Sequence, residues 1–216
     1  MNYVAGDLRD QLAHLGHAVV QAGLVVGSGG NLSARLPGTD VCWASAAGAW
    51  LDRLNRPSFV RIRIPDGTVV DESATEPAAT TELGLHLAIY RVRPDVNTVV
   101  HLHPQAVLLL DALNQPIRLV STDHAYYVRR VVTMPFSPPG TDAVGASAAK
   151  ACADGTNCLV LARHGSAVLS DSVELAHKRV VNLEEAARLT YHALALGGEL
   201  TDCLTDWLEA SGQVAV

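Results

Sequence analysis

The segment from Val96 to His103 most constrains what this chain can fold into. It is rich in β-branched residues, Pro94 precedes it and Pro104 follows it. This composition is typical of a buried strand, while the prolines separate the strand from its neighbours. On both sides, over residues 80 to 92 and 104 to 113, apolar side chains recur at helical spacing. The sequence therefore predicts a core strand between two helices.

The rest of the chain alternates in the same way between helical and strand patterns. Further helices are expected at residues 5 to 22, 142 to 153, 172 to 196 and 200 to 209, and strands at 41 to 45, 59 to 64, 131 to 134 and 158 to 162. Asp66-Gly67 before Val69-Val70 indicates a hairpin. No repeat or linker divides the 216 residues. We expect one domain, residues 1 to 216, with helices packed around a mixed sheet.

The composition favours small-molecule chemistry. A net charge of -6 and a pI near 5.8 leave no basic stripe for a nucleic acid. No uncharged stretch approaches the roughly 18 residues of a membrane span, and the start does not resemble a signal peptide. The four cysteines, Cys42, Cys152, Cys158 and Cys203, form no Cys-x-x-Cys pair and are interpreted as buried free thiols. We expect a cytoplasmic protein with no membrane or nucleic-acid partner.

Two histidines, His101 and His103, end the central strand. Residues i and i+2 of a strand point to the same face, so the two imidazoles lie together. This arrangement fits a metal site, and it also fits two hydrogen-bonded histidines at a strand end. His164 follows the apolar run Cys158 to Ala162 and would lie at the end of a neighbouring strand. There it can supply a third ligand, although a histidine before a glycine is more often an ordinary turn residue. Three histidines leave a coordination position open for substrate oxygens.

Polar residues near the histidines can supply the rest of a site. Glu82 lies at the start of the helix over residues 80 to 92, where a simple first-turn glutamate is the commoner role. A carboxylate beside a metal can also move a proton next to a carbonyl. His86 lies on the same helix face and is a reserve ligand or a packed core histidine. The glycine-rich turn before Asn31 and Ser33, with Thr80 and Thr81, can cradle a phosphate, although such turns also serve chain reversal.

Two other catalytic mechanisms find no support in the sequence. Lys150 and Lys178 are the only lysines, and both fall on expected Ala-rich helices, which disfavours a Schiff base. No Gly-x-Ser-x-Gly motif is present, which disfavours a serine nucleophile.

Five blocks of the chain resemble the class II aldolase/adducin family. They are Gly29 to Ser33, Thr80 to Tyr90, His101 to Pro104, Ala162 to Gly165 and Val181 to Ala187. The resemblance implies a three-layer α/β/α fold with a central mixed, largely antiparallel sheet. It also implies a homotetramer with active sites at subunit interfaces, and zinc, manganese or cobalt on His101, His103 and His164.

The resemblance further implies a carbon-carbon lyase. The family's aldolases cleave a short ketose 1-phosphate to dihydroxyacetone phosphate and an aldehyde. The metal stabilises the enediolate form of dihydroxyacetone phosphate in this reaction. The glutamate that matches Glu82 shuttles the carbon-bound proton. Tyr126 or Tyr127 is the nearest candidate to protonate the aldehyde oxygen, and packing or interface roles for both stay open.

The resemblance places phosphate binding on Asn31, Gly48, Thr80 and Thr81. Ser45-Ala46-Ala47-Gly48 lacks one hydroxyl that relatives carry in this loop. The same site would also serve decarboxylation of a 3-oxo sugar acid phosphate, sugar-phosphate dehydration or 4-epimerisation. Outside enzymes, the alternative is a non-catalytic, adducin-like assembly domain.

Overall fold

A seven-stranded sheet forms the centre of the computed structural model, which describes residues 4–70, 77–203 and 210. The strands are β1 (Asn31–Arg35), β2 (Val41–Ser45), β3 (Phe59–Arg63), β4 (Thr98–Leu102), β5 (Val131–Met134), β6 (Cys158–Leu161) and β7 (Gly165–Ser170). Their order is β3-β2-β1-β4-β7-β6-β5. Only the pairing of β5 with β6 is parallel. The sheet is thus mixed and largely antiparallel, as expected.

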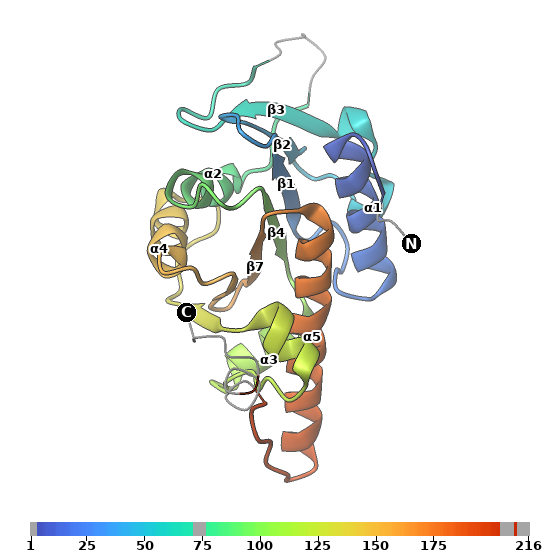
Figure 1. Cartoon of the computed structure of the whole chain (residues 1–216), viewed down its shortest axis with the longest axis vertical. Coiled ribbons are helices and arrows are strands. Elements are labelled where there is room, and N and C mark those ends of the chain that lie inside the picture. The colour runs from blue at the N-terminus through green and yellow to red at the C-terminus, as the bar shows by residue number, and fades with distance from the viewer. Residues whose placement is uncertain (1–3, 71–76, 204–209, 211–216) are drawn as a thin grey trace.

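Helices cover both faces of the sheet (Figure 1). They are α1 (Leu8–Gln21), α2 (Leu83–Val92), α3 (Gln105–Ala112), α4 (Asp142–Cys152) and α5 (Val173–Ala195), with short turns η1 (Leu51–Arg53), η2 (Arg56–Ser58) and the π-helical η3 (His124–Val128). One apolar core joins α1, α3 and α5 to the sheet, and a second joins α2 and α4 to the opposite face. The three-layer α/β/α fold is confirmed. None of the described helices is long and apolar enough to cross a lipid bilayer.

The alternation of side chains along β4 decides which face carries the histidines. Val100 and Leu102 pack in the core under α1, α3 and α5, whereas Val99 packs in the core under α2 and α4. Because side chains alternate between the two faces of a strand, His101 points to the same face of the sheet as Val99. The first histidine of the pair therefore points to the side of the sheet that α2 covers.

Two strands of the sheet were not predicted. β1 begins at Asn31, directly after the glycine-rich turn, and pairs with β4 in the middle of the sheet. Gly30 makes this possible, because its φ is 94° and a Cβ there would lie only 2.5 Å from the His101 carbonyl oxygen. β7 is the second of these strands and is completely buried.

The predicted elements otherwise agree with the structure to within a few residues. The expected hairpin is present as a single antiparallel bridge between Ile62 and Val69, not as a paired strand. The helix expected at residues 200 to 209 lies largely outside the described residues.

Candidate active site

Four side chains from separate parts of the chain converge at the ends of β4 and β6. Glu82 is the N-cap of α2, His101 lies on β4, His103 follows it, and His164 lies in the turn between β6 and β7. Their potential ligand atoms all lie within 4.8 Å of one another. The three ring centroids are 4.7 to 5.0 Å apart. The structure thus brings together the three candidate metal ligands and the candidate acid/base group that the sequence singled out.

The geometry and protonation of the histidines fit a divalent metal. The Nδ1 of His101 lies 2.9 Å from the Ser166 carbonyl oxygen and donates to it, which leaves the Nε2 lone pair for an ion. The Nε2 atoms of His101 and His103 are 3.1 Å apart, close to the roughly 3.3 Å between nitrogens on a tetrahedral zinc. Burial, together with the neighbouring histidines, lowers the pKa of His103 to about 4. The same causes lower the pKa of His164.

Glu82 is held in a half-buried position against two of the histidines. Its Oε2 lies 3.1 Å from His101 Nε2 and accepts a hydrogen bond of 2.9 Å from the Asn31 side-chain amide. Its Oε1 lies 3.2 Å from His164 Nε2 but has no hydrogen-bond partner among the described residues. Burial opposes ionisation, but the contacts with His101 and Asn31 lower the pKa of Glu82 to about 2. The carboxylate is therefore charged at neutral pH.

The turn that carries His164 has an unusual backbone. Arg163 adopts a φ of 59°, a left-handed conformation that costs a non-glycine residue about 1 kcal/mol or more. The carboxylate of Asp111, from α3, accepts the Arg163 N–H at 2.6 Å and secures this conformation. After His164 comes Gly165, where a Cβ would lie 2.7 Å from Cδ2 of His103. Only glycine lets the backbone after His164 approach the His103 ring this closely.

The residues expected to bind phosphate lie on adjoining loops beside Glu82. Ala46 pairs with Ala79 in an isolated bridge, which puts the turn at Gly48 next to Thr80. The hydroxyl of Thr80 accepts the Glu82 N–H at 3.3 Å, and the neighbouring Thr81 is exposed. The loops therefore lie next to the cluster.

The side chain of Asn31, the fourth residue of this group, is already engaged at both ends. Its Nδ2 contacts Glu82, and its Oδ1 lies 2.5 Å from His86 Nε2. The other nitrogen of His86, Nδ1, lies 2.7 Å from the Ser33 hydroxyl. His86 is completely buried. It is therefore a hydrogen-bonded core histidine, the second of the two interpretations that the sequence allowed.

The tyrosines lie elsewhere. Tyr126 and Tyr127 belong to η3, with their rings edge to face at 4.9 Å. The Tyr127 carbonyl accepts a hydrogen bond from Arg179 of α5, and the Tyr126 side chain is 52% exposed. The structure therefore places η3 on the α5 side of the sheet, across from α2.

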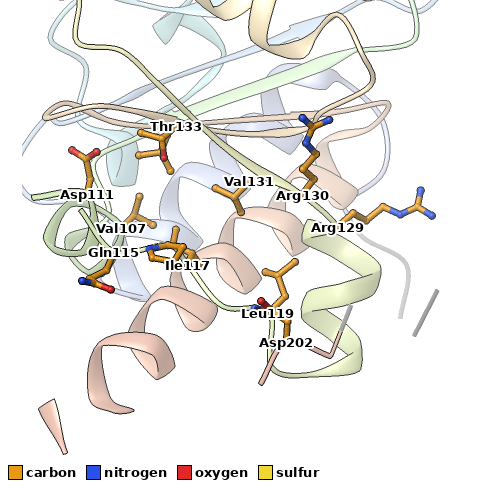
Figure 2. A pocket seen from close by; sticks show the side chains of 12 residues that line it. Val107, Asp111, Gln115, Ile117, Leu119, Arg129, Arg130, Val131, Thr133 and Asp202 are labelled. Atoms are coloured by element: carbon orange, nitrogen blue, oxygen red, sulfur yellow. Dashed lines mark hydrogen bonds between the residues drawn. The ribbon is translucent and has the colours of Figure 1, made fainter. Parts of the chain in front are cut away.

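A separate cavity of about 330 Å³ lies on that same side of the sheet. Figure 2 shows Asp111 and Thr133 at one end and Leu119 and Asp202 at the other, with apolar side chains such as Val131 between them. None of the four residues of the cluster lines it. Asp111 lines the cavity and also secures the turn before His164.

The supporting residues Asp111, Ser166 and Glu184 were not singled out from the sequence. The carboxylate of Glu184, from α5, accepts the N–H groups of Ala106 and Val107 at the start of α3, just after His103. Glu184 belongs to one of the blocks that resemble the family, and this was the only signal that marked it. Asp111 accepts a backbone N–H through its carboxylate and Ser166 acts through its backbone carbonyl, and neither has a sequence pattern of its own.

Comparisons with known proteins identify the family of this chain. The profile of the Class II Aldolase and Adducin N-terminal domain matches residues 10–191. L-fuculose phosphate aldolase of Methanococcus vannielii is 28% identical, over 81% of this chain and 91% of its own length. The 3-oxo-tetronate 4-phosphate decarboxylase of Cupriavidus necator is 35% identical, over 84% of this chain and 82% of its own length.

A solved structure supports the fold assignment. L-fuculose-1-phosphate aldolase of Thermus thermophilus superposes with a TM-score of 0.76 at 22% identity, over 90% of this chain and 98% of its own. The chain therefore belongs to the class II aldolase/adducin family, and its curated relatives make it an enzyme of the lyase type.

Proposed function

We propose that this chain is a divalent-metal-dependent carbon-carbon lyase that acts on a sugar phosphate. His101, His103 and His164 would hold the metal, zinc or else manganese or cobalt. A bound ion of this kind supplies a Lewis acid for the carbonyl and hydroxyl oxygens of the substrate. The observation that carries the proposal is the convergence of three imidazoles and one charged carboxylate within 4.8 Å.

Glu82 is the acid/base group in this proposal. Asn31 holds its Oε2, which leaves the buried Oε1 to exchange a proton with carbon. The carboxylate is charged before substrate binds, because the pKa of Glu82 is about 2. After the carbon-carbon bond breaks, the carboxylate would take up a proton from solvent and pass it to the carbon that keeps the electron pair.

The substrate we favour is a short ketose 1-phosphate, cleaved to dihydroxyacetone phosphate and an aldehyde. The proposed phosphate site consists of Gly48, Thr80 and Thr81, with Asn31 at its border to the cluster. The bridge between Ala46 and Ala79 brings these loops beside Glu82. A phosphate bound there would fix one end of the substrate and present its carbonyl to the histidines.

In the direction of aldol addition, Tyr126 or Tyr127 would protonate the aldehyde oxygen across a subunit interface of a homotetramer. Within one chain η3 packs on α5, and the exposed Tyr126 ring can reach a second copy. Light scattering of the purified protein tests this assembly. A monomer with full activity would contradict it.

Single-domain organisation over residues 1 to 216 and a cytoplasmic location stay predictions.

Decarboxylation of a 3-oxo sugar acid phosphate is the second candidate reaction. The 35% identity to a 3-oxo-tetronate 4-phosphate decarboxylase favours it. The two reactions break different carbon-carbon bonds at the same kind of metal centre, so the site residues keep their roles. Dehydration and 4-epimerisation would use the same site.

The test combines metal analysis with two activity assays. Protein purified without chelator should contain about one divalent ion per chain; an absence of metal would favour the adducin-like assembly domain. Release of dihydroxyacetone phosphate from ketose 1-phosphates is compared with release of carbon dioxide from 3-oxo-tetronate 4-phosphate. Glu82→Gln should lower kcat about 100- to 10,000-fold on the active substrate.

Glu174→Gln is the matched control, because Glu174 is an exposed residue of α5 that pairs with Lys178. This variant should retain wild-type kcat. Full activity of Glu82→Gln would overturn the role assigned to Glu82.

A further inference from the structure

A continuous chain of four hydrogen bonds leads through the core to the Glu82 carboxylate. Tyr90 Oη lies 2.8 Å from Ser33 Oγ, and Ser33 Oγ lies 2.7 Å from His86 Nδ1. His86 Nε2 lies 2.5 Å from Asn31 Oδ1, and Asn31 Nδ2 lies 2.9 Å from Glu82 Oε2. The four side chains that lead to Glu82 are all buried. Each link must therefore have one donor and one acceptor, because an unpaired buried polar group is costly.

The chain arises from two regular spacings in the sequence. Glu82, His86 and Tyr90 are four residues apart, at the start and along one side of α2, whereas Asn31 and Ser33 are two residues apart on one face of β1. The two rows of side chains alternate along the contact. This places His86 between the two β1 residues.

The amide of Asn31 fixes the direction of every hydrogen bond. Its Nδ2, which can only donate, faces Oε2 of Glu82, and its Oδ1, which can only accept, faces His86. His86 must then donate from Nε2. Because burial lowers its pKa to about 3, the ring is neutral and Nδ1 is an acceptor. Ser33 consequently donates to His86 and accepts from Tyr90.

We propose that His86 is a positioning residue: its Nε2–H fixes the amide of Asn31, and this amide holds Oε2 of Glu82. If the amide of Asn31 were turned over, its carbonyl oxygen would face the carboxylate and its NH2 group would face the Nε2–H of His86. Both contacts would be repulsive. The tautomer of a buried histidine thus determines where Oε2 of the carboxylate lies. The inference deepens the proposed function, since it takes Glu82 as the acid/base group.

The first test does not depend on activity. Nitrogen-15 NMR of the histidine rings in the full chain reports the tautomer of each ring. His86 is expected to be neutral with its proton on Nε2 between pH 6 and 8, and its Nε2–H should exchange slowly. A proton on Nδ1, or a doubly protonated ring near neutral pH, would overturn the inference whether or not the lyase assay succeeds.

The second test uses two amides of different reach at position 86. Glutamine places its NH2 near the site of Nε2 and can still donate to Asn31, whereas asparagine places its amide near the site of Nδ1 and can contact only Ser33. On the substrate that wild type turns over, His86→Asn should lower kcat about 10- to 100-fold with little change in KM. His86→Gln should recover most of this loss.

Equal losses in His86→Asn and His86→Gln would contradict the proposal, because they would indicate packing as the only role of the ring. Thermal unfolding of both variants shows whether they fold. Tyr90→Phe removes only the far end of the chain and should change kcat by less than about threefold, since the link between His86 and Asn31 is intact. A larger loss in Tyr90→Phe than in His86→Asn would also count against a direct role for His86.

Discussion

At the residue scale, Glu184 shows how a carboxylate can position a site that it does not enter. The N-cap of α3 is Pro104, which provides no capping side chain. The Glu184 carboxylate takes this role from α5, with hydrogen bonds of 3.0 Å and 3.2 Å from the N–H groups of Ala106 and Val107. Because His103 directly precedes Pro104, Glu184 fixes the helix end from which this histidine is presented.

Replacing Glu184 by glutamine should lower the free energy of unfolding by about 1 kcal/mol at pH 4, since the variant keeps one acceptor oxygen but loses the second hydrogen bond. Burial raises the pKa of Glu184, although the two backbone N–H groups oppose this. A carboxyl group whose pKa is higher in the folded than in the unfolded protein stabilises the fold at pH values below the unfolded-state pKa. This stabilisation is lost as the pH rises through the folded-state pKa. The difference between wild type and Glu184→Gln should therefore shrink from pH 4 to pH 7.

Urea unfolding of both proteins at several pH values measures this difference. Glu185→Gln is the matched control, because the adjacent Glu185 carboxylate is 60% exposed and lies 3.3 Å from His124 Nε2, away from the start of α3. The opposite result would be a difference in unfolding free energy between wild type and Glu184→Gln that grows from pH 4 to pH 7. It would show that the N–H groups at the start of α3 stabilise the charged carboxylate by more than its burial costs.

At the element scale, the turn between β6 and β7 joins a strained backbone to a candidate metal ligand. Arg163 holds a left-handed φ of 59°, and the Asp111 carboxylate binds its N–H. Without this hydrogen bond the turn can relax and move His164. Asp111→Ala should therefore weaken zinc affinity about tenfold, whereas Asp111→Asn, which keeps an acceptor oxygen, should change it by less than about threefold.

Competition with a chromogenic chelator measures the two affinities. Arg163→Gly provides an internal check, since glycine adopts the left-handed conformation without a steric cost. In the Arg163→Gly background Asp111→Ala should cause a smaller loss of affinity than in wild type. Equal losses of zinc affinity in both backgrounds would show that Asp111 does not act by holding the strained backbone of the turn.

The elements that the sequence did not predict have a common physical cause. β1 and β7 lie on either side of β4 in the centre of the sheet, yet β1 contains the buried polar residues Asn31 and Ser33, and β7 begins at Gly165. Strand patterns are recognised by β-branched residues, which these positions lack because the site needs hydrogen bonds and close approach. Strands built mainly for packing, such as β3 and β6, were predicted closely.

At the scale of the whole molecule, the site could be predicted in part. His101 and His103 follow from the alternation of a strand, and His164 from its place after an apolar run. Glu82 depended on the family resemblance, because a glutamate at a helix start usually has a simpler role. The partners of His86 could not be predicted, since they depend on the register between β1 and β4 and on the rotation of α2.

Removal of metal should destabilise the entire fold, because the cluster ties the start of α2 to β4 and to the turn between β6 and β7. An ion that binds only the folded state, at about 100 times its Kd, adds about 2.7 kcal/mol. For a chain of this length that corresponds to about 5 to 10 °C in Tm. Dialysis against a chelator should lower the Tm by this amount, and zinc should restore it.

The ligand assignment predicts which variants lose this response. His164→Gln removes one of the three imidazoles, so its Tm should hardly change on chelation. His192→Gln alters an exposed histidine at the end of α5 and should keep the full shift. If His164→Gln responded to the chelator as wild type does, the metal would be bound elsewhere. The convergence of the three histidines would then have to be explained by their mutual packing and by the Glu82 carboxylate alone.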